Sequence, residues 1–331
     1  MTPAGLSTLL QAFFARRLIG QLNASPHTVA AYRDTFRILL RFAAERLRRA
    51  PSSLSVEDID APFISRFLDA LERQRGNSER TRNCRLAAVH AFFRYVAIED
   101  PAHALQCQQI LAIPRKRHER DPVEFLSPEE AAAILAAPDP RTWIGRRDRT
   151  LLLVALQTGL RNSELRNLAS RDVALGKGAH LRCLGKGRKS RCTPLRPDVA
   201  ATLKAWLAER RVRPEDPVFP NSRGGAMSAD TLQRLLAQHC VAAAKACPSL
   251  ARKSVSPHTL RHTAAMDLLR RGVDLTVIAL WLGHESTETT QMYIHADMQL
   301  KERALAHATA SGRPPTRYRA PDRLLAFLEG L

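Results

Sequence analysis

Five short segments in the C-terminal two-thirds of the chain carry side chains that suit one kind of chemistry. Together they supply two guanidinium groups, an ammonium, two imidazoles and a phenol. None pairs a nucleophile with a carboxylate base, and none has the ligand spacing of a metal site. Two arginines that bind a phosphodiester and a tyrosine that attacks it would form a site for cutting that bond. The candidate residues are Arg161, Lys186, His258, Arg261, His284 and Tyr293.

The two arginines are placed so that they could share one phosphate. Arg161 comes just after Gly159, where a helix is expected to stop in a turn that exposes the next side chains. Arg261 lies one turn into a helix expected to begin at Ser256-Pro257, and a helix N-terminus favours an anion. His258 precedes Arg261 by three residues, so both side chains can point at the same phosphate.

Tyr293 is the candidate nucleophile. A phenol has a pKa of about 10, so it needs cationic neighbours or a base before it can attack at neutral pH. His258 could accept or orient its proton, and Lys186, on a glycine-flanked hairpin, suits the acid that protonates the leaving oxygen, with Lys189 second. A single helical tyrosine is usually a core residue, and a junction histidine such as His284 is usually a packed turn residue. The interpretation therefore depends on the ordered set.

The charge of the chain indicates an acidic polymer as its partner. There are 51 Lys and Arg residues against 32 Asp and Glu residues, a formal net charge of +19 over 331 residues. Both halves of the chain share the excess, as a clamp around nucleic acid would require. A solvated basic surface or a membrane-facing patch is the plainer alternative.

The six cysteines include no C-x-x-C pair, so the sequence supports neither a zinc site nor a redox motif. Their spread is typical of reduced, mostly buried thiols. Arg16 and Arg17 interrupt the apolar N-terminus, and the run Leu151–Leu156 is too short to span a bilayer. We therefore expect a cytoplasmic protein.

Helical periodicity dominates the first third of the chain. Helices are expected at residues 6–18, 28–49 and 78–98, and a further helix is expected to begin with a capping-box variant at Ser55 and to run through Leu71. These four helices would form a domain over residues 1–112. Its outward arginines would either contact DNA or be merely solvated; they are Arg80, Arg82 and Arg85.

Proline and dense charge mark residues 113–123 as an exposed basic linker. Beyond it, a domain over residues 124–312 is expected to be mostly helical, with a β-hairpin over residues 179–195. A tail over residues 313–331 would hold one short helix with an apolar stripe, which would dock either onto its own chain or onto a neighbouring subunit. The predicted fold class is mainly α with a small β-sheet (α+β).

The ordered segments TGLRNSEL, GKGRKSR, SPHTLRH, LGHES and QMYIHA resemble the tyrosine recombinase (phage integrase) family over about residues 124–310. The resemblance implies a core-binding domain in front of a catalytic domain, with the six candidates as the catalytic residues and Tyr293 as the nucleophile. It also implies that Glu164 braces Arg161, that His295 supports the site, and that neither a cofactor nor a metal takes part.

The same resemblance implies a mechanism and partners. Tyr293 would cut one strand of double-stranded DNA through a 3′-phosphotyrosyl bond, and a 5′-hydroxyl of a partner duplex would rejoin it. Four protomers, a homo-tetramer or one with partner recombinases, would act on two duplexes in the nucleoid, with the tail helix docking in trans. The segment 281–305 looks most like members carried by transposons and other mobile elements, which integrate or excise DNA.

Two alternatives remain at this stage. A topoisomerase of the related tyrosine class would use similar residues to cut and reseal one duplex. A DNA-binding accessory protein of the same fold would do no chemistry, but such a role places no demand on Tyr293 or Lys186.

Overall fold

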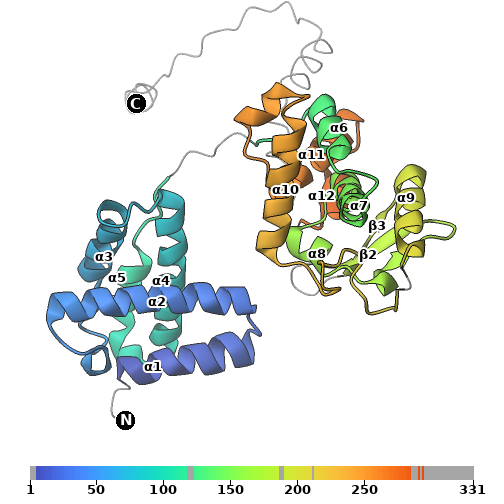
Figure 1. Cartoon of the computed structure of the whole chain (residues 1–331). Helices are drawn as coiled ribbons and strands as arrows, with labels where there is room; N and C mark the ends of the chain where they lie inside the picture. Colours follow the sequence, from blue (N-terminus) through green and yellow to red (C-terminus); the bar gives the residue numbers. More distant parts are fainter. Residues whose placement is uncertain are drawn as a thin grey trace, which may run out of the picture. The chain divides into compact units, whose positions relative to one another are not determined.

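The computed structural model describes residues 5–117, 123–185, 190–210 and 212–284, together with Thr290 and Tyr293. The chain divides into two compact units, Met1–Asp121 and Pro122–Leu331. The described residues form helices and one small antiparallel sheet, which confirms the predicted fold class (Figure 1). None of the helices in this part of the chain is both long and apolar enough to cross a membrane.

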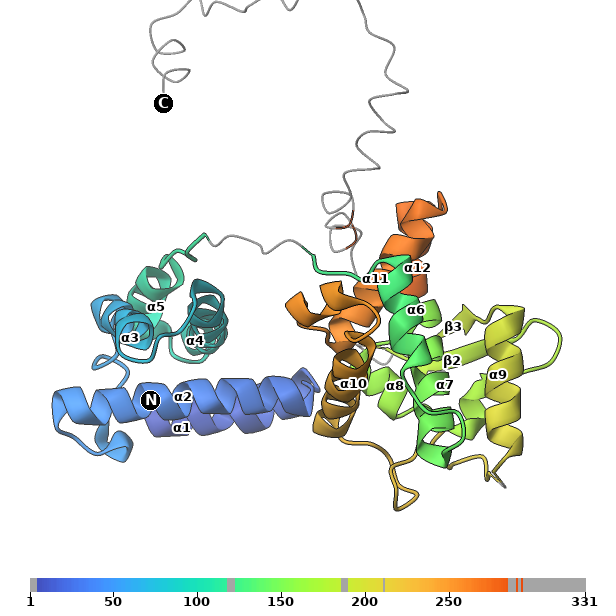
Figure 2. The ribbon, with the colours of Figure 1, turned by 45° about the horizontal axis from the view of Figure 1, so that its top comes forward.

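The first unit is helical and packs around a cluster of aromatic rings. Phe13 lies at its centre, with ring centroids 5.5 Å from Phe92 and 6.3 Å from Phe36. Helix α1 runs alongside α2 in both ribbon views (Figures 1 and 2). The elements are α1 (Leu6–Ala12) with a π-helical continuation (Phe13–Gln21), α2 (Pro26–Leu47), α3 (Ala61–Arg73), α4 (Glu79–Glu99) and α5 (Ala104–Leu111), with 3₁₀ turns at Pro51–Ser53 and Pro101–His103.

Serine caps fix two of these helix starts where the sequence predicts them. The hydroxyl groups of Ser25 and Ser78 accept backbone N–H bonds at the starts of α2 and α4. The predicted start at Ser55 is wrong. The carboxylate of Asp60 accepts the N–H of Phe63 at 2.7 Å, so α3 begins six residues later than Ser55.

The arginines of α4 differ from their predicted exposure. Arg80 is exposed, but Arg82 is buried and donates to the carbonyl of Pro114 at 3.1 Å. Arg85 is half-buried and donates to the hydroxyl of Thr35 at 3.0 Å. These two side chains therefore bind elements of the first unit together, and the start of the predicted linker is bonded to α4. Helix α5, which the sequence did not predict, packs on α4 as well.

The second unit is built around α7. Its three strands form one antiparallel sheet in the order β1-β2-β3, with Val173 opposite Leu181 and Arg182 opposite Cys192. The predicted hairpin is confirmed, and β1 extends it. The sheet and α9 lie to one side of α7 and α10 lies to the other (Figures 1 and 2). The elements are α6 (Pro128–Ala136), α7 (Trp143–Thr158), α8 (Asn162–Arg166), β1 (Val173–Ala174), β2 (His180–Leu184), β3 (Ser190–Pro194), α9 (Pro197–Ala208), α10 (Ala229–Ala243), α11 (Pro257–Arg270) and α12 (Leu275–Leu282), with 3₁₀ turns at Ser170–Asp172 and Pro248–Arg252.

Candidate active site

Two glycines allow the ends of two helices to meet at the site. Gly159 ends α7 with a φ of 63°, and a Cβ there would lie 2.6 Å from a methyl carbon of Leu282. Gly283 ends α12 with a φ of 67°, and a Cβ there would lie 2.8 Å from a guanidinium nitrogen of Arg191. Only glycine adopts this backbone without strain and leaves room for these contacts. The ends of α7 and α12 therefore approach each other closely beside β3.

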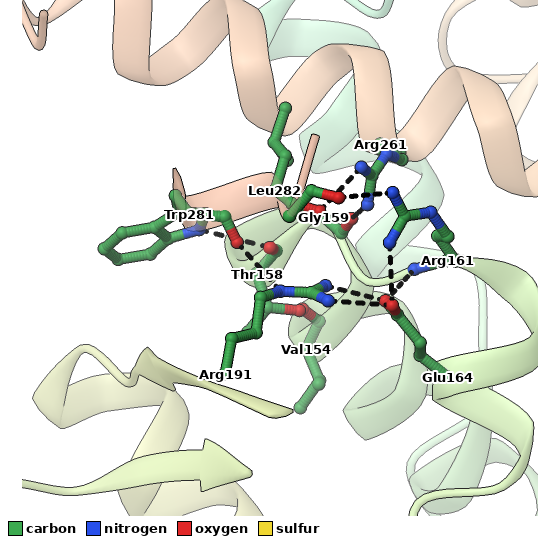
Figure 3. A network of polar contacts seen from close by, with 10 residues as sticks. Val154, Thr158, Gly159, Arg161, Glu164, Arg191, Arg261, Trp281 and Leu282 are labelled. Carbon is green, nitrogen blue, oxygen red and sulfur yellow. Dashed lines mark hydrogen bonds and ion pairs between the residues drawn. The ribbon is translucent and has the colours of Figure 1, made fainter. Parts of the chain in front are cut away.

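The two predicted arginines point into this junction and are held by main-chain carbonyls (Figure 3). Arg261, on α11, is buried and donates to the carbonyls of Gly159 and Leu282, each at 2.7 Å. Arg161, just before α8, donates to the carbonyl of Gly283 at 2.6 Å. A guanidinium has five N–H donors, so these bonds fix the orientation of each side chain and leave donors for an anion.

Glu164 braces Arg161 from the other side, together with an arginine that the sequence analysis missed. Its carboxylate accepts the backbone N–H of Arg161 at 2.8 Å and the side chain of Arg161 at 2.9 Å. Arg191, on β3, donates to both carboxylate oxygens at 2.8 and 2.7 Å and to the carbonyl of Trp281 at 3.1 Å (Figure 3). The carboxylate of Glu164 thus bonds to the guanidinium groups of Arg161 and Arg191, and its charge also acts on Arg261. Three guanidinium groups share one carboxylate, so the site keeps a positive excess.

Burial raises the pKa of Glu164, but hydrogen bonds from Arg191 and Arg161 outweigh it and lower the pKa to about 2. Burial is also the main cause that lowers the pKa of Arg261, to about 10, and the positive charge of Arg161 acts in the same direction. Glu164 is therefore fully ionised at neutral pH. The crowding of Arg161 and Arg261 costs free energy that a bound phosphate would recover.

Tyr293 lies between two histidine rings. Its hydroxyl oxygen is 3.0 Å from Nδ1 of His262, and its ring is stacked on His284 with centroids 6.5 Å apart. Nδ1 of His284 is in turn 2.8 Å from the hydroxyl of Thr290. His258 lies one helical turn before His262 on α11, with ring centroids 6.2 Å apart. Three imidazoles and the phenol therefore form one continuous group.

The burial of these side chains determines their protonation states. Tyr293 is 1% exposed, and burial raises its pKa to about 12 although the positive charge of Arg261 opposes the shift. Burial, followed by the charges of neighbouring cations, lowers the pKa values of His262 and His284 to about 4 each. At neutral pH the site thus holds a neutral phenol beside two neutral imidazoles.

The structure brings together four of the six predicted residues, Arg161, Arg261, His284 and Tyr293. The fifth, His258, lies beside His262. The sixth, Lys186, lies outside the described residues, as do Lys189 and His295.

Two residues with close contacts in the site, Arg191 and His262, were missed. His262 could have been found, because it follows Arg261 directly and lies four residues after His258 on one helix face. Nothing local distinguishes Arg191 from the other basic residues of its hairpin. Among the described residues no group of three or more His, Cys, Asp or Glu side chains is placed to hold a metal ion.

We expect Glu164→Gln to destabilise the protein by about 3–5 kcal/mol at pH 7, because it leaves the charges of Arg161 and Arg191 without their buried partner. The folded-state pKa of about 2 lies below the ordinary value of 4.5, so the stabilisation is complete above pH 4.5 and is lost as the pH falls toward 2. Urea unfolding should therefore show a smaller difference from wild type at about pH 3 than at neutral pH.

A matched control for this prediction is Glu215→Gln. Glu215 is exposed and its nearest ion-pair distance, to Arg213, is 3.8 Å. Its loss should change the free energy of unfolding by about 0.5 kcal/mol or less. Equal effects of the two substitutions, or a Glu164 effect independent of pH, would show that the carboxylate does not balance these arginines.

Comparisons with known proteins identify the family of the chain. The model of the Phage integrase family matches residues 124–300, and the model of the N-terminal SAM-like domain of phage integrases matches residues 11–100. A putative integrase/recombinase of Sinorhizobium fredii is 53% identical over 328 residues, covering 99% of each chain. The tyrosine recombinase XerC of Pelobacter propionicus is 35% identical over 309 residues, covering 91% of this chain and 95% of the relative.

Solved structures share the fold. The XerH site-specific recombinase bound to its difH substrate aligns with a TM-score of 0.63 and 24% identity, covering 92% of this chain and 84% of that one. The Tn1549 transposon integrase in complex with transposon right end DNA aligns with a TM-score of 0.68 and 16% identity, covering 91% and 99%.

Proposed function

The chain belongs to the phage integrase family of tyrosine-type, site-specific DNA recombinases, and from this premise we propose that Tyr293 is its nucleophile. The observation that carries the proposal is the position of the buried phenol in the same junction as the guanidinium groups of Arg161 and Arg261. The charge of Arg261 acts on the phenol directly, lowering a pKa that burial raises. A tyrosine that only filled the core would need neither Arg161 nor Arg261 beside it.

The proposed reaction cuts one strand and conserves its bond energy. Arg161 and Arg261 bind the nonbridging oxygens of the phosphate, where negative charge grows during attack. His258 and His284 complete the phosphate site, and Lys186 protonates the leaving 5′-oxygen. The resulting 3′-phosphotyrosyl bond replaces one phosphate ester with another, so a 5′-hydroxyl can reverse the step without an energy source.

Double-stranded DNA is the proposed substrate. The net charge of +19 supports a polyanionic partner, and the XerH and Tn1549 proteins whose folds align were solved with DNA. We assign residues 1–112 to a DNA-clamping domain and residues 124–312 to the catalytic domain, joined by a basic linker. The proposed assembly is a tetramer on two duplexes in the cytoplasm, with the tail of residues 313–331, which lies outside the described residues, docking in trans.

Movement of a mobile element is the biological role that we propose. The name of the Sinorhizobium fredii relative, a putative integrase/recombinase, supports integration or excision. The fold shared with a transposon integrase is compatible with transposition. Strand exchange between two duplexes separates this role from a topoisomerase, which would relax one duplex and yield no intermolecular product.

Covalent trapping tests the proposal. DNA from the ends of the element that surrounds the gene would be nicked beside the suspected cut, so that the short fragment diffuses away and the intermediate accumulates. Incubation with the protein in EDTA should give a protein–DNA adduct at a 3′ end on a denaturing gel. Tight DNA binding with no adduct on any end would indicate instead a DNA-binding accessory role.

A further inference from the structure

We propose that His262 accepts the proton of Tyr293 during strand cleavage and is therefore a seventh catalytic residue. The inference rests on the proposed role of Tyr293 as the nucleophile. The sequence pattern predicted that His258 takes this proton, and the structure favours His262, the residue after Arg261, instead. The chemistry is general-base activation of a phenol by a neutral imidazole.

The contact is direct. The 3.0 Å between Nδ1 of His262 and the hydroxyl oxygen of Tyr293 is hydrogen-bond distance. The two rings meet edge to face, with an angle of 62° between their planes and centroids 5.6 Å apart. The contact therefore joins one ring nitrogen of His262 to the oxygen that would attack phosphorus.

The other histidine in contact with Tyr293 is placed for a different task. The ring of His284 lies nearly parallel to that of Tyr293, with only 14° between their planes and centroids 6.5 Å apart. Its Nδ1 is 2.8 Å from the hydroxyl of Thr290. That arrangement supports the ring of Tyr293 and leaves the contact with its oxygen to His262.

The fold couples the proposed base to the phosphate site. His262 and Arg261 are consecutive residues of α11, which packs along α7. Arg261 is anchored at both ends of its guanidinium by the carbonyls of Gly159 and Leu282. A base and a phosphate ligand on one rigid helix keep a fixed spacing, which favours a reproducible approach of the tyrosine to the phosphate.

The charge state of His262 suits an acceptor. Burial first, and then the nearby His258 and Arg261, lower its pKa to about 4, so the ring is neutral and offers a lone pair. The raised pKa of Tyr293 keeps the proton on the phenol in the free protein. A bound phosphate offsets the positive charges that depress the pKa of His262, which makes the acceptor stronger only when DNA is in place.

Two proton transfers accompany the exchange of one P–O bond for another. The oxygen of Tyr293 forms a bond to phosphorus while its proton moves to Nδ1 of His262. The bond from phosphorus to the 5′-oxygen breaks, and that oxygen takes a proton from Lys186. The phosphodiester carries one negative charge before and after the step, and the charge that grows on its nonbridging oxygens during attack is stabilised by Arg161 and Arg261. Rejoining runs the same transfers backward, with neutral Lys186 taking the proton of the 5′-hydroxyl and protonated His262 returning its proton to the phenolate.

The test is single-turnover adduct formation on the nicked DNA substrate by His262→Asn and His262→Ala. Asparagine places a polar atom near the position of Nδ1 and keeps a hydrogen bond, but it cannot accept the proton. Both variants should therefore lose about 10²–10⁴-fold in rate while DNA affinity stays nearly unchanged. A wild-type rate in His262→Asn would overturn the proposal, because the histidine would then only position the phenol. The control is His180→Asn, on β2, whose Nδ1 contacts the carbonyl of Gly178 at 2.8 Å and which should keep the full rate.

A substrate with sulfur in place of the leaving 5′-oxygen separates the base from the acid. A thiolate leaves without a proton, so this substrate should restore cleavage by Lys186→Ala but not by the His262 variants. Restoration of the His262 variants would place His262 on the leaving group and refute the assignment. If wild type forms no adduct on either substrate, or Tyr293→Phe still forms one, the proposed function fails and not merely the role of His262.

A measurement on the unsubstituted protein covers the case in which both variants unfold. The proposal requires the tautomer with its proton on Nε2, so that Nδ1 can accept. Nitrogen NMR of ¹⁵N-histidine-labelled protein should show an unprotonated, pyridine-like Nδ1 for His262. A protonated Nδ1 in that spectrum would mean that the ring donates to Tyr293, and the proposal would be wrong.

Discussion

Tyr293→Phe should abolish the covalent adduct and strand exchange. The substitution removes the oxygen that would bond to phosphorus, and we expect a loss on the order of 10⁴-fold or more, below detection on a gel. The phenyl ring still fills the buried site, so the cost in stability is that of one hydrogen bond to His262, about 0.5–1.5 kcal/mol. DNA binding should stay close to wild type. Covalent trapping and a gel-shift titration measure the two effects on the same DNA.

Tyr95→Phe is the matched control. Tyr95 is also a buried tyrosine, 7% exposed, but it lies on α4 in the first unit among aromatic rings. Its hydroxyl has no proposed part in the reaction, so adduct formation should be unchanged. An adduct that persists in Tyr293→Phe would require another nucleophile and would remove the central element of the proposed function.

Arg261→Lys should slow cleavage by about 10²–10⁴-fold and leave binding to long duplex DNA largely intact. One lysine ammonium cannot reach the carbonyls of Gly159 and Leu282 and also donate a paired bond to phosphate. The site also works against a lysine charge. Burial and the charge of Arg161 already lower the pKa of Arg261 to about 10, and the same causes would act on an ammonium whose ordinary pKa is lower.

Arg271→Lys, on the same helix, controls for the chemical change. Arg271 is exposed at the end of α11 and pairs with Asp267 at 2.9 Å. Lysine can keep that exposed pair, so both cleavage and stability should match wild type. If Arg261→Lys cut DNA as fast as Arg271→Lys, the paired donors of Arg261 would have no part in the reaction.

Local signals made much of the fold predictable. Serine side chains cap four helices by accepting backbone N–H groups within three residues; they are Ser25, Ser78, Ser127 and Ser256. The start of each of these helices can therefore be predicted from the residues next to it. The same logic failed at Ser55 because three carboxylates, those of Glu57, Asp58 and Asp60, follow within five residues. One of them, Asp60, caps α3 instead.

The parts that were missed depend on contacts between distant segments. Arg82 resembles its neighbour Arg80 in the sequence, yet it is buried because residue 114 returns to α4 and offers a carbonyl. Arg191 and Glu164 are 27 residues apart, and only the packing of β3 beside α8 makes them partners. The types of the site residues could be predicted from sequence, whereas their hydrogen-bond partners required the tertiary structure.

The end of α12 carries a constraint of another kind. The carbonyls of three consecutive residues, Trp281, Leu282 and Gly283, accept hydrogen bonds from Arg191, Arg261 and Arg161 respectively. Every residue type presents the same main-chain carbonyl. The acceptors that orient the three guanidinium groups therefore depend on the course of the backbone and not on the side chains. Mutation can replace Trp281 or Leu282 without deleting an acceptor, provided that the helix still ends at Gly283. Selection that keeps the arginines in place therefore acts on the length of α12 and on the turn at Gly283. It constrains the identities of Trp281 and Leu282 only weakly.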